Sequence, residues 1–284
     1  MLKVLSLGAG VQSSTLLLMA LKGELERPDC AVFADTGWEP KAVYEHLERL
    51  KAECERNGFH LHLVSQGCLP TDLKHHINNW QDESRWAWEG QPPFSVINRT
   101  PKPGMPADDG GGRLWRHCTR EYKIKPIHRH IRRVLGFKKG QRMPKEPVVE
   151  RWYGISIDEC QRMRDSREKW AQNRYPLIDA GMDRNNCKKW LERNGWGEVP
   201  RSSCVGCPYH SNAYWRRMKK YMPDEWADAV AFDKELRKQQ YPGVTGKVYI
   251  HRDMVPLDEV DLSTDRDRGQ LDLFGEECEG MCGV

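Results

Sequence analysis

The fold is decided by residues 2–20, which read Leu2-Lys3-Val4-Leu5-Ser6-Leu7-Gly8-Ala9-Gly10-Val11-Gln12-Ser13-Ser14-Thr15-Leu16-Leu17-Leu18-Met19-Ala20. The first apolar run predicts a strand and the second a helix, with a Gly- and Ser-rich turn between them. Gly8 and Gly10 permit close approach of the backbone, and Ser13 places a hydroxyl at the helix N-terminus, where the dipole favours an anion. The stretch therefore predicts a phosphate-binding loop, with an adenine nucleotide as the expected ligand.

The loop does not match two common phosphate-binding loops. It lacks the closing Gly-Lys-Ser/Thr of a Walker A loop, and its glycines do not have the Rossmann spacing. Its own spacing is Ser-x-Gly-x-Gly-x-x-Ser-Ser over residues 6–14. This spacing resembles the pyrophosphatase loop (PP-loop) of the adenine nucleotide alpha-hydrolase superfamily.

Three blocks of sequence resemble the PAPS reductase-like family within that superfamily. The first is Gly10-Val11-Gln12-Ser13-Ser14, in which Val11-Gln12 stands where the ATP pyrophosphatases carry Lys-Asp. The second is an apolar strand that ends in Asp35-Thr36-Gly37, and the third is Cys118–Pro126. A weaker fourth block, residues 154–159, has Ser156 where the reductases usually have Arg. The blocks follow the order that they have in the family.

The resemblance implies an α/β fold, a parallel sheet flanked by helices, and a set of nucleotide-binding residues. The loop would hold the phosphates, and the turn at residues 35–37 would contact the ribose or the adenine. The implied cofactor-binding residues are Ser6, Gly8, Gly10, Gln12, Ser13, Ser14, Asp35, Thr36 and Gly37. The implied ligand is ATP or an adenylylsulfate (PAPS or APS).

Hydrophobic periodicity predicts alternating strands and helices in the first half of the chain. Strands are expected over residues 2–6, 30–35, 59–64 and 148–155, and helices over 13–22, 39–57, 120–135, 183–194, 211–221 and 223–240. Such alternation predicts a parallel sheet with its ligand at the carboxyl ends of the strands. The expected domains are a nucleotide-binding domain at 1–160 with an irregular insertion at 78–113, a helical metal- or cluster-binding region at 161–261, and a flexible tail at 262–284.

Composition indicates a cytoplasmic protein without membrane contact. No apolar stretch approaches the ~20 residues that span a bilayer, and the N-terminus has no signal-peptide pattern. Ten cysteines in a reducing compartment favour metal, cluster or redox chemistry over disulfides. The net charge of +4 permits contact with nucleic acid without arguing for it. The basic segment 120–133 is expected to be a solvated helix, with phosphate contact as the alternative.

A Cys-x-x-Cys turn at Cys204 and Cys207 is the second chemical feature of the sequence. Two thiolates at this spacing can bind one metal ion or one cluster, and more ligands are needed. The resemblance implies Cys118 as the third ligand and a 4Fe-4S cluster as the cofactor. Because His117-Cys118 replaces the adjacent Cys-Cys pair of the reductases, another ligand is required. For this fourth ligand Cys187 is the first choice, His210 is the second, and an iron left open without a protein ligand is the third. The alternatives to a cluster are a structural zinc ion and thiols that bind no metal.

The C-terminal segment contains Gln270-Leu271-Asp272-Leu273-Phe274, which resembles the pentapeptide that docks bacterial DNA polymerases and repair proteins on the sliding clamp. Such a segment places apolar side chains in a groove while the glutamine makes polar contacts. A DNA sliding clamp is therefore one expected partner. The alternative is that Leu271, Leu273 and Phe274 hold the tail against its own domain.

Two cysteines near the end of the chain, Cys278 and Cys282, are candidate catalytic thiols. Glu277-Cys278-Glu279-Gly280 partly resembles the Glu-Cys-Gly tail of the reductases, whose cysteine attacks the sulfur of the nucleotide, but the Gly-Leu/Ile-His continuation is missing. A thiolate or persulfide there would deliver sulfur to the nucleotide, with a thiol or sulfur-donor protein as a further partner. The alternative is a pair of exposed or metal-binding thiols.

The leading function is PAPS reductase-like sulfur chemistry, in which a thiolate attacks an adenylylsulfate. The second is an ATP-dependent adenylating sulfurtransferase that modifies nucleic acid, and the third is a non-catalytic nucleotide-binding protein recruited to DNA by its tail. Val11-Gln12 in place of Lys-Asp argues against the second. The incomplete reductase tail and the clamp-like segment argue against the first.

Overall fold

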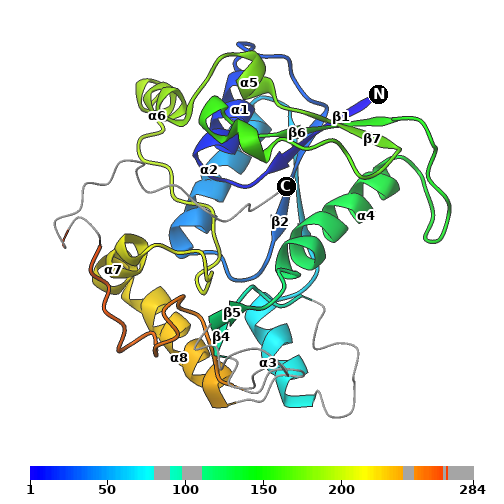
Figure 1. Cartoon of the computed structure of the whole chain (residues 1–284). Helices are drawn as coiled ribbons and strands as arrows, with labels where there is room; N and C mark the ends of the chain where they lie inside the picture. The colour runs from blue at the N-terminus through cyan, green and yellow to red at the C-terminus, as the bar shows by residue number, and fades with distance from the viewer. Residues whose placement is uncertain (80–89, 98–110, 239–245, 265–266, 268–284) are drawn as a thin grey trace. The chain divides into compact units, whose positions relative to one another are not determined.

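The chain forms two compact units in a computed structural model (Figure 1). The structure describes residues 1–79, 90–97, 111–238, 246–264 and 267. The first unit comprises Met1–Gln66 and Tyr122–Ser203, and the second comprises Gly67–Glu121 and the described residues from Cys204 onward. No helix in these described ranges is long and apolar enough to cross a membrane.

A five-stranded parallel sheet forms the centre of the first unit, with the strand order β3-β2-β1-β6-β7. Its strands are β1 (Leu2–Leu7), β2 (Cys30–Asp35), β3 (His60–Ser65), β6 (Val149–Tyr153) and β7 (Ala171–Arg174). Val4 of β1 is paired with Cys30 on one side and with Arg151 on the other. Because the strand order changes direction at β1, the carboxyl end of β1 lies at the position where open α/β sheets bind their ligands.

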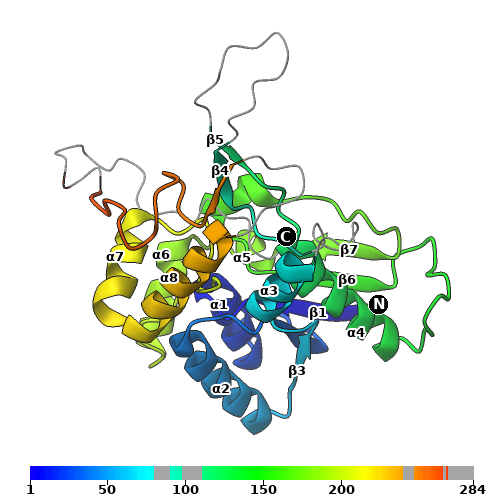
Figure 2. The same ribbon diagram turned by 90° about the horizontal axis from the view of Figure 1, so that it is seen from below.

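Helices cover both faces of this sheet (Figures 1 and 2). They are α1 (Val11–Leu21), α2 (Lys41–Arg56), α4 (Lys125–Val134), α5 (Pro176–Asp179) and α6 (Arg184–Arg193). A π-helical turn η1 (Thr119–Ile124) directly precedes α4, and a 3-10 turn η2 (Ile157–Arg162) follows β6. On one face Leu5 and Phe33 pack with Leu47 of α2 in the larger apolar core. On the other face, Val4 and Val32 pack with Ile127 and Ile131 of α4. The alternation of inward residues along β1 and β2 produces these two cores.

The second unit contains a three-stranded antiparallel sheet in the order β5-β4-β8. Its elements are β4 (Ser95–Ile97), β5 (Gly111–Arg113), β8 (Val248–Tyr249), α3 (Leu69–Asn79), α7 (Asn212–Tyr221) and α8 (Pro223–Lys238). The fully buried carboxylate of Asp233 accepts hydrogen bonds from the backbone N–H groups of Ile250, at 3.0 Å, and Leu257, at 3.1 Å, and from Arg237. This carboxylate ties the chain after β8 to helix α8.

The α/β fold predicted from the sequence is confirmed, and the expected strands at 2–6, 30–35, 59–64 and 148–155 correspond to β1, β2, β3 and β6. The sequence analysis missed β7, because its residues Ala171-Gln172-Asn173-Arg174 carry no apolar pattern. β7, α5 and α6 belong to the first unit although they follow residue 160, where a boundary was expected. The segment expected to be an irregular insertion, 78–113, contains the short strands β4 and β5.

Candidate nucleotide-binding site

The predicted phosphate loop connects the carboxyl end of β1 to the N-terminus of α1. Ala9 has a positive φ of 56°, and Gly10 is the N-cap of α1 with an extended backbone. The hydroxyl of Ser13 accepts hydrogen bonds from the N–H groups of Gly8, at 3.2 Å, and Gly10, at 3.3 Å. Ser13 therefore folds the loop over the start of the helix. The first-turn amides of a helix have no intrahelical acceptor, so the loop presents N–H donors and the positive end of the dipole to an anion.

Close packing around the loop requires glycine at Gly154, directly after β6. A Cβ atom at Gly154 would lie 2.6 Å from the backbone nitrogen of Ser13 and 2.7 Å from its Cα. Ser202 lies on another side of the loop, with its hydroxyl oxygen 3.5 Å from a Cβ built at Gly8. Two chain segments, at Gly154 and at Ser202, thus lie against the loop within the first unit.

Gln12 links the loop to the fourth sequence block. Its side-chain nitrogen donates to the hydroxyl of Ser156 at 3.4 Å and to Oε2 of Glu159 at 3.1 Å. Its Oε1 accepts from Nη1 of Arg184 at 2.8 Å, and Glu159 also pairs with Arg162 at 2.8 Å. The structure therefore brings two arginines to the first turn of α1. Sequence analysis did not identify them, because Arg184 and Arg162 lie far along the chain from Gln12 and in no motif.

The turn at Asp35–Gly37 lies at the carboxyl end of β2, as predicted. Oδ1 of Asp35 accepts from the N–H of Gly37 at 2.8 Å and from the hydroxyl of Tyr44 at 2.9 Å. Burial together with the Asp35 carboxylate raises the pKa of Tyr44, so its hydroxyl stays protonated and donates. The hydroxyl of Thr36 is buried and donates to Glu39 at 3.1 Å. Thr36 therefore shapes the turn from inside.

The remaining hydroxyls of the loop region differ in exposure. Ser14 is fully buried, and its Oγ lies 2.9 Å from Nε2 of His46 on α2. Ser6 lies within β1, where it is paired with Val32 of β2 and with Tyr153 of β6. Burial lowers the pKa of His46 to about 4, so the imidazole is neutral at pH 7. Ser14 and His46 thus join α1 to α2 beneath the loop.

The four predicted cysteine ligands lie in different surroundings. Cys118, Cys204 and Cys207 belong to the second unit and are partly exposed. The N–H of Cys207 donates to the carbonyl of Cys204 at 3.1 Å, which confirms a turn at the Cys-x-x-Cys motif. Arg113, five residues before Cys118, stacks on the ring of Tyr209, two residues after Cys207.

Cys187, by contrast, lies on α6 in the larger apolar core of the first unit and is fully buried. Burial raises the pKa of its thiol to about 12. The proposed alternative ligand His210 places Nε2 2.9 Å from the carbonyl of Cys204 and thereby braces the turn. Among the described residues no three His, Cys, Asp or Glu side chains are close enough to hold a metal ion. The described residues therefore do not complete a cluster site, and the four-cysteine set stays a prediction.

Two other predicted features lie outside the described residues: the catalytic thiols Cys278 and Cys282, and the clamp-like segment Gln270-Leu271-Asp272-Leu273-Phe274. Fold and site together define an α/β protein in which a Gly- and Ser-rich loop joins the central strand of a parallel sheet to a helix N-terminus, at the carboxyl edge of the sheet.

No protein-family model matches the chain, and no curated protein matches its sequence. Among solved structures the chain is similar to the U34-tRNA thiolase NcsA from Methanococcus maripaludis with its 4Fe-4S cluster. The match covers 87% of this chain and 76% of that chain, with 11% sequence identity and a TM-score of 0.39. A likeness at this level transfers neither activity nor cofactor to this chain.

Proposed function

We propose that this chain is an enzyme that binds an adenine nucleotide at the loop of residues 8–14 and uses it in sulfur chemistry. The observation that carries the proposal is the geometry of the loop: a hydroxyl of Ser13 that gathers two backbone N–H groups at a helix N-terminus, next to the carboxyl end of the central strand β1. The sequence resemblance to PAPS reductase-like proteins supports the choice of adenine nucleotide and of sulfur.

In this proposal a phosphate group becomes the acceptor for the N–H groups of Gly8 and Gly10, and the released Ser13 hydroxyl donates a hydrogen bond to the same phosphate. The guanidinium groups of Arg162 and Arg184 neutralise the phosphate charge, since both already contact the polar cluster around Gln12. Asp35 lies at the end of the neighbouring strand β2, where it accepts from the sugar or the base.

The leading reaction is reduction of an adenylylsulfate. A thiolate attacks the sulfate sulfur and the bond from that sulfur to the phosphate oxygen breaks. A second thiol then attacks the first, so that sulfite leaves and the two thiols become a disulfide. Cys278 and Cys282 are the candidate pair. Neither step passes through a cluster, for which Cys118, Cys187, Cys204 and Cys207 are the predicted ligands.

The second candidate reaction is adenylation of a nucleic-acid base, in which ATP transfers AMP to a base oxygen, pyrophosphate leaves, and a sulfur nucleophile displaces AMP. The clamp-like segment at residues 270–274 favours it, because docking on a sliding clamp brings an enzyme to DNA.

Calorimetric titration of the full chain with ATP, PAPS and APS tests the nucleotide site. We expect one of these to bind, and Ser13→Ala to weaken binding about tenfold or more, as for loss of a hydrogen bond to a charged group. Ser211→Ala is the matched control, because it removes a serine hydroxyl that caps α7 in the second unit. The proposal fails if no adenine nucleotide binds, or if the two variants weaken binding equally.

Product analysis then separates the two reactions. Sulfite release from PAPS or APS that is lost in Cys278→Ser supports reduction, and release of pyrophosphate from ATP in the presence of nucleic acid supports adenylation. If neither product appears while nucleotide binding persists, the chain is a nucleotide-dependent accessory protein.

The proposed partner of the Gln270–Phe274 segment is the sliding clamp. Leu273→Ala with Phe274→Ala would abolish binding to purified clamp in a surface plasmon resonance assay, because the apolar anchors supply most of the energy of such a contact. Glu276→Ala with Glu277→Ala changes the same region of sequence outside the motif and would leave binding in place. Equal loss in both variants would contradict the motif.

A further inference from the structure

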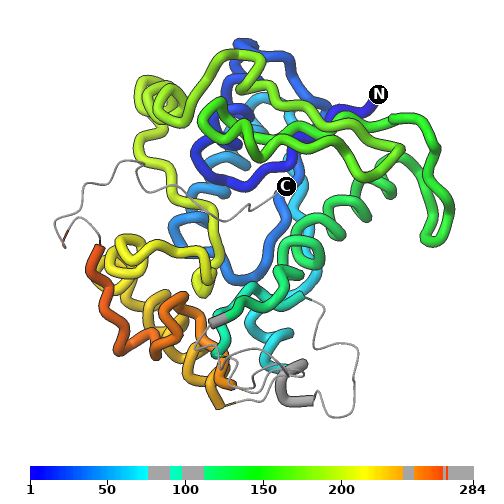
Figure 3. The backbone as a smooth tube through the Cα atoms, viewed as in Figure 1, coloured from blue at the N-terminus to red at the C-terminus, as the bar shows by residue number. Residues whose placement is uncertain are grey.

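One segment of the first unit holds an unusual concentration of positive charge. Residues 122–145 contain nine Lys and Arg side chains and no Asp or Glu, although the whole chain has a net charge of only +4. The remainder of the chain is therefore net negative. The segment comprises α4 and the loop that follows it, and Figure 3 shows the backbone turning back from the end of α4 toward β6.

Six of these cations are exposed and form what we call the α4 basic face: Arg129, Arg133, Lys138, Lys139, Arg142 and Lys145. None of the six forms an ion pair with any other residue that the structure describes. The other cations of the segment have partners, since Lys123 pairs with Glu39 at 3.5 Å, and Arg132 donates to backbone carbonyls. The positive charge of the face is thus not neutralised by neighbouring carboxylates.

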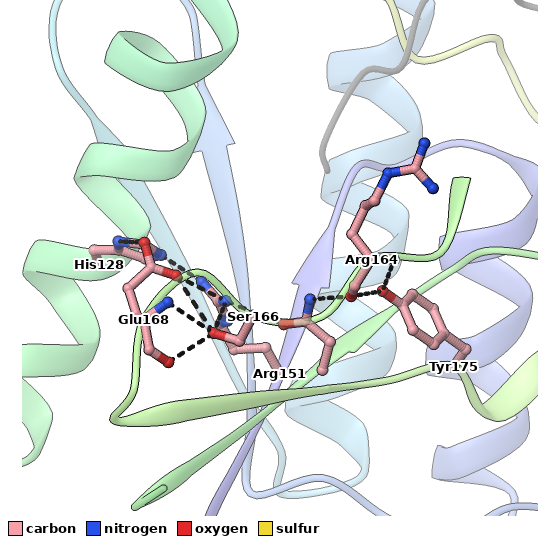
Figure 4. A network of polar contacts seen from close by, with 7 residues as sticks. His128, Arg151, Arg164, Ser166, Glu168 and Tyr175 are labelled. Atoms are coloured by element: carbon pink, nitrogen blue, oxygen red, sulfur yellow. Dashed lines mark hydrogen bonds and ion pairs between the residues drawn. The ribbon is translucent and has the colours of Figure 1, made fainter. Parts of the chain in front are cut away.

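The helix that carries this face is fixed on the sheet. Pro126, Ile127 and Ile131 are buried against the sheet, and His128 contacts Arg151 of β6 at 2.6 Å (Figure 4). Arg151 in turn donates to Glu168 at 3.0 Å, and it also donates to Ser166 and Asn173. With these residues turned inward, Arg129 and Arg133 lie four residues apart, about 6 Å along the axis, on the outward side of α4.

The loop after α4 is fixed as well. Arg132 donates to the carbonyl of Lys138 at 3.4 Å and to that of Gln141, and the N–H of Lys138 donates to Oε1 of Gln141 at 3.1 Å. Leu135 and Met143 pack against the apolar core under α4. The cations of the loop are therefore held beside the last turn of α4, so a partner would not have to order a free loop on binding.

We propose that the α4 basic face binds the sugar-phosphate backbone of duplex DNA. Lys and Arg side chains on a fixed scaffold supply the phosphate contacts that dominate the affinity of proteins for nucleic acid. Within the described part of the chain the six cations have no carboxylate partner, and Arg129 donates only to the neutral amide of Gln66. A membrane surface fits less well, because an interfacial helix inserts its apolar side into the lipid, whereas the apolar side of α4 is packed on the sheet. The choice of DNA rests on the proposed clamp docking of residues 270–274, which places the enzyme on DNA.

Fluorescence anisotropy with a short labelled DNA duplex tests this surface without clamp or nucleotide. The triple variant Arg133→Gln, Lys139→Gln, Arg142→Gln would raise the Kd at least about tenfold. It would also reduce the slope of log Kd against log salt by about 3, since each lost phosphate contact removes about one unit. The matched control is Lys188→Gln, Lys189→Gln, Arg193→Gln, which removes three exposed cations from α6 of the same unit.

Equal loss of binding in the two triple variants would overturn the proposal, because the effect would then follow net charge alone. Binding to an RNA duplex or to phosphatidylserine vesicles with none to DNA would also overturn it. Titration of the α4 triple variant with the adenine nucleotide separates this proposal from the proposed nucleotide site. Unchanged nucleotide affinity together with weakened DNA binding would support a separate DNA-binding surface. If the wild-type chain binds no adenine nucleotide, the proposed function fails, but the comparison of the two triple variants for DNA binding remains valid.

Discussion

The two units of the molecule differ in how their candidate sites are built. In the first unit the loop of residues 8–14 is contiguous in sequence, and the strand order of the sheet places it at an edge where ligands bind. In the second unit the candidate ligands Cys118 and Cys204 come from segments far apart in the chain. A contiguous loop on a buried sheet gains its geometry from local structure, whereas a site assembled from distant segments depends on the stability of the whole unit.

The largest expected effect concerns the assembly of the second unit. Asp233→Ala removes the buried acceptor of two backbone N–H groups and of Arg237, and we expect the free energy of unfolding to fall by about 3–5 kcal/mol. In a denaturant titration the second unit would unfold first, while the first unit keeps its affinity for the nucleotide. Glu235→Ala, an exposed carboxylate on the same helix, is the control and would leave the midpoint nearly unchanged. Simultaneous loss of nucleotide binding would show that the nucleotide site depends on the second unit.

Acid would affect the first unit through its buried histidine. The pKa of His46 is about 4 in the folded chain and 6.5 in its ordinary state. Below pH 6.5 the unfolded chain therefore binds a proton that the folded chain does not, so stability falls as the pH decreases from 6.5 to about 4 and is unaffected above this window. His46 accounts for about 3 kcal/mol of this loss. We expect His46→Gln to flatten the stability curve across the window, measured by denaturant titration at a series of pH values.

The loop itself is probed by Gly154→Ala. The added methyl group would lie 2.6 Å from the nitrogen of Ser13, so the loop must shift, at a cost of about 1–3 kcal/mol in stability. We expect nucleotide affinity to fall at least about tenfold, because the N–H donors at the N-terminus of α1 would be displaced. Gly112→Ala is the control, since its Cβ would make an ordinary 3.5 Å contact with Val96. Calorimetry that finds wild-type affinity in Gly154→Ala would show that the nucleotide binds elsewhere.

The fold and the loop were predictable because their signals are local. The apolar alternation of β1 and β2 and the Gly/Ser-rich turn each lie within a few residues, so periodicity and spacing reveal them. Two other features were not predictable. β7 is polar in sequence because Gln172 and Asn173 make side-chain contacts with Glu150 and Arg151 of the neighbouring strand. Arg184 reaches Gln12 across more than half of the chain, and no single-sequence pattern reports such a contact.

Cys187 tests most directly whether a predicted cysteine ligand is instead a side chain of the apolar core. We expect Cys187→Ser to reduce the stability of the first unit by about 1–3 kcal/mol, because it places a hydroxyl in an apolar core. Its burial predicts that iron, zinc and sulfide contents of anaerobically purified protein would not change. Cys204→Ser would give the opposite pattern, with metal lost and the first unit unaffected, since its thiol is partly exposed in the Cys-x-x-Cys turn. Metal loss from a folded Cys187→Ser protein would instead establish Cys187 as the ligand that the sequence predicts.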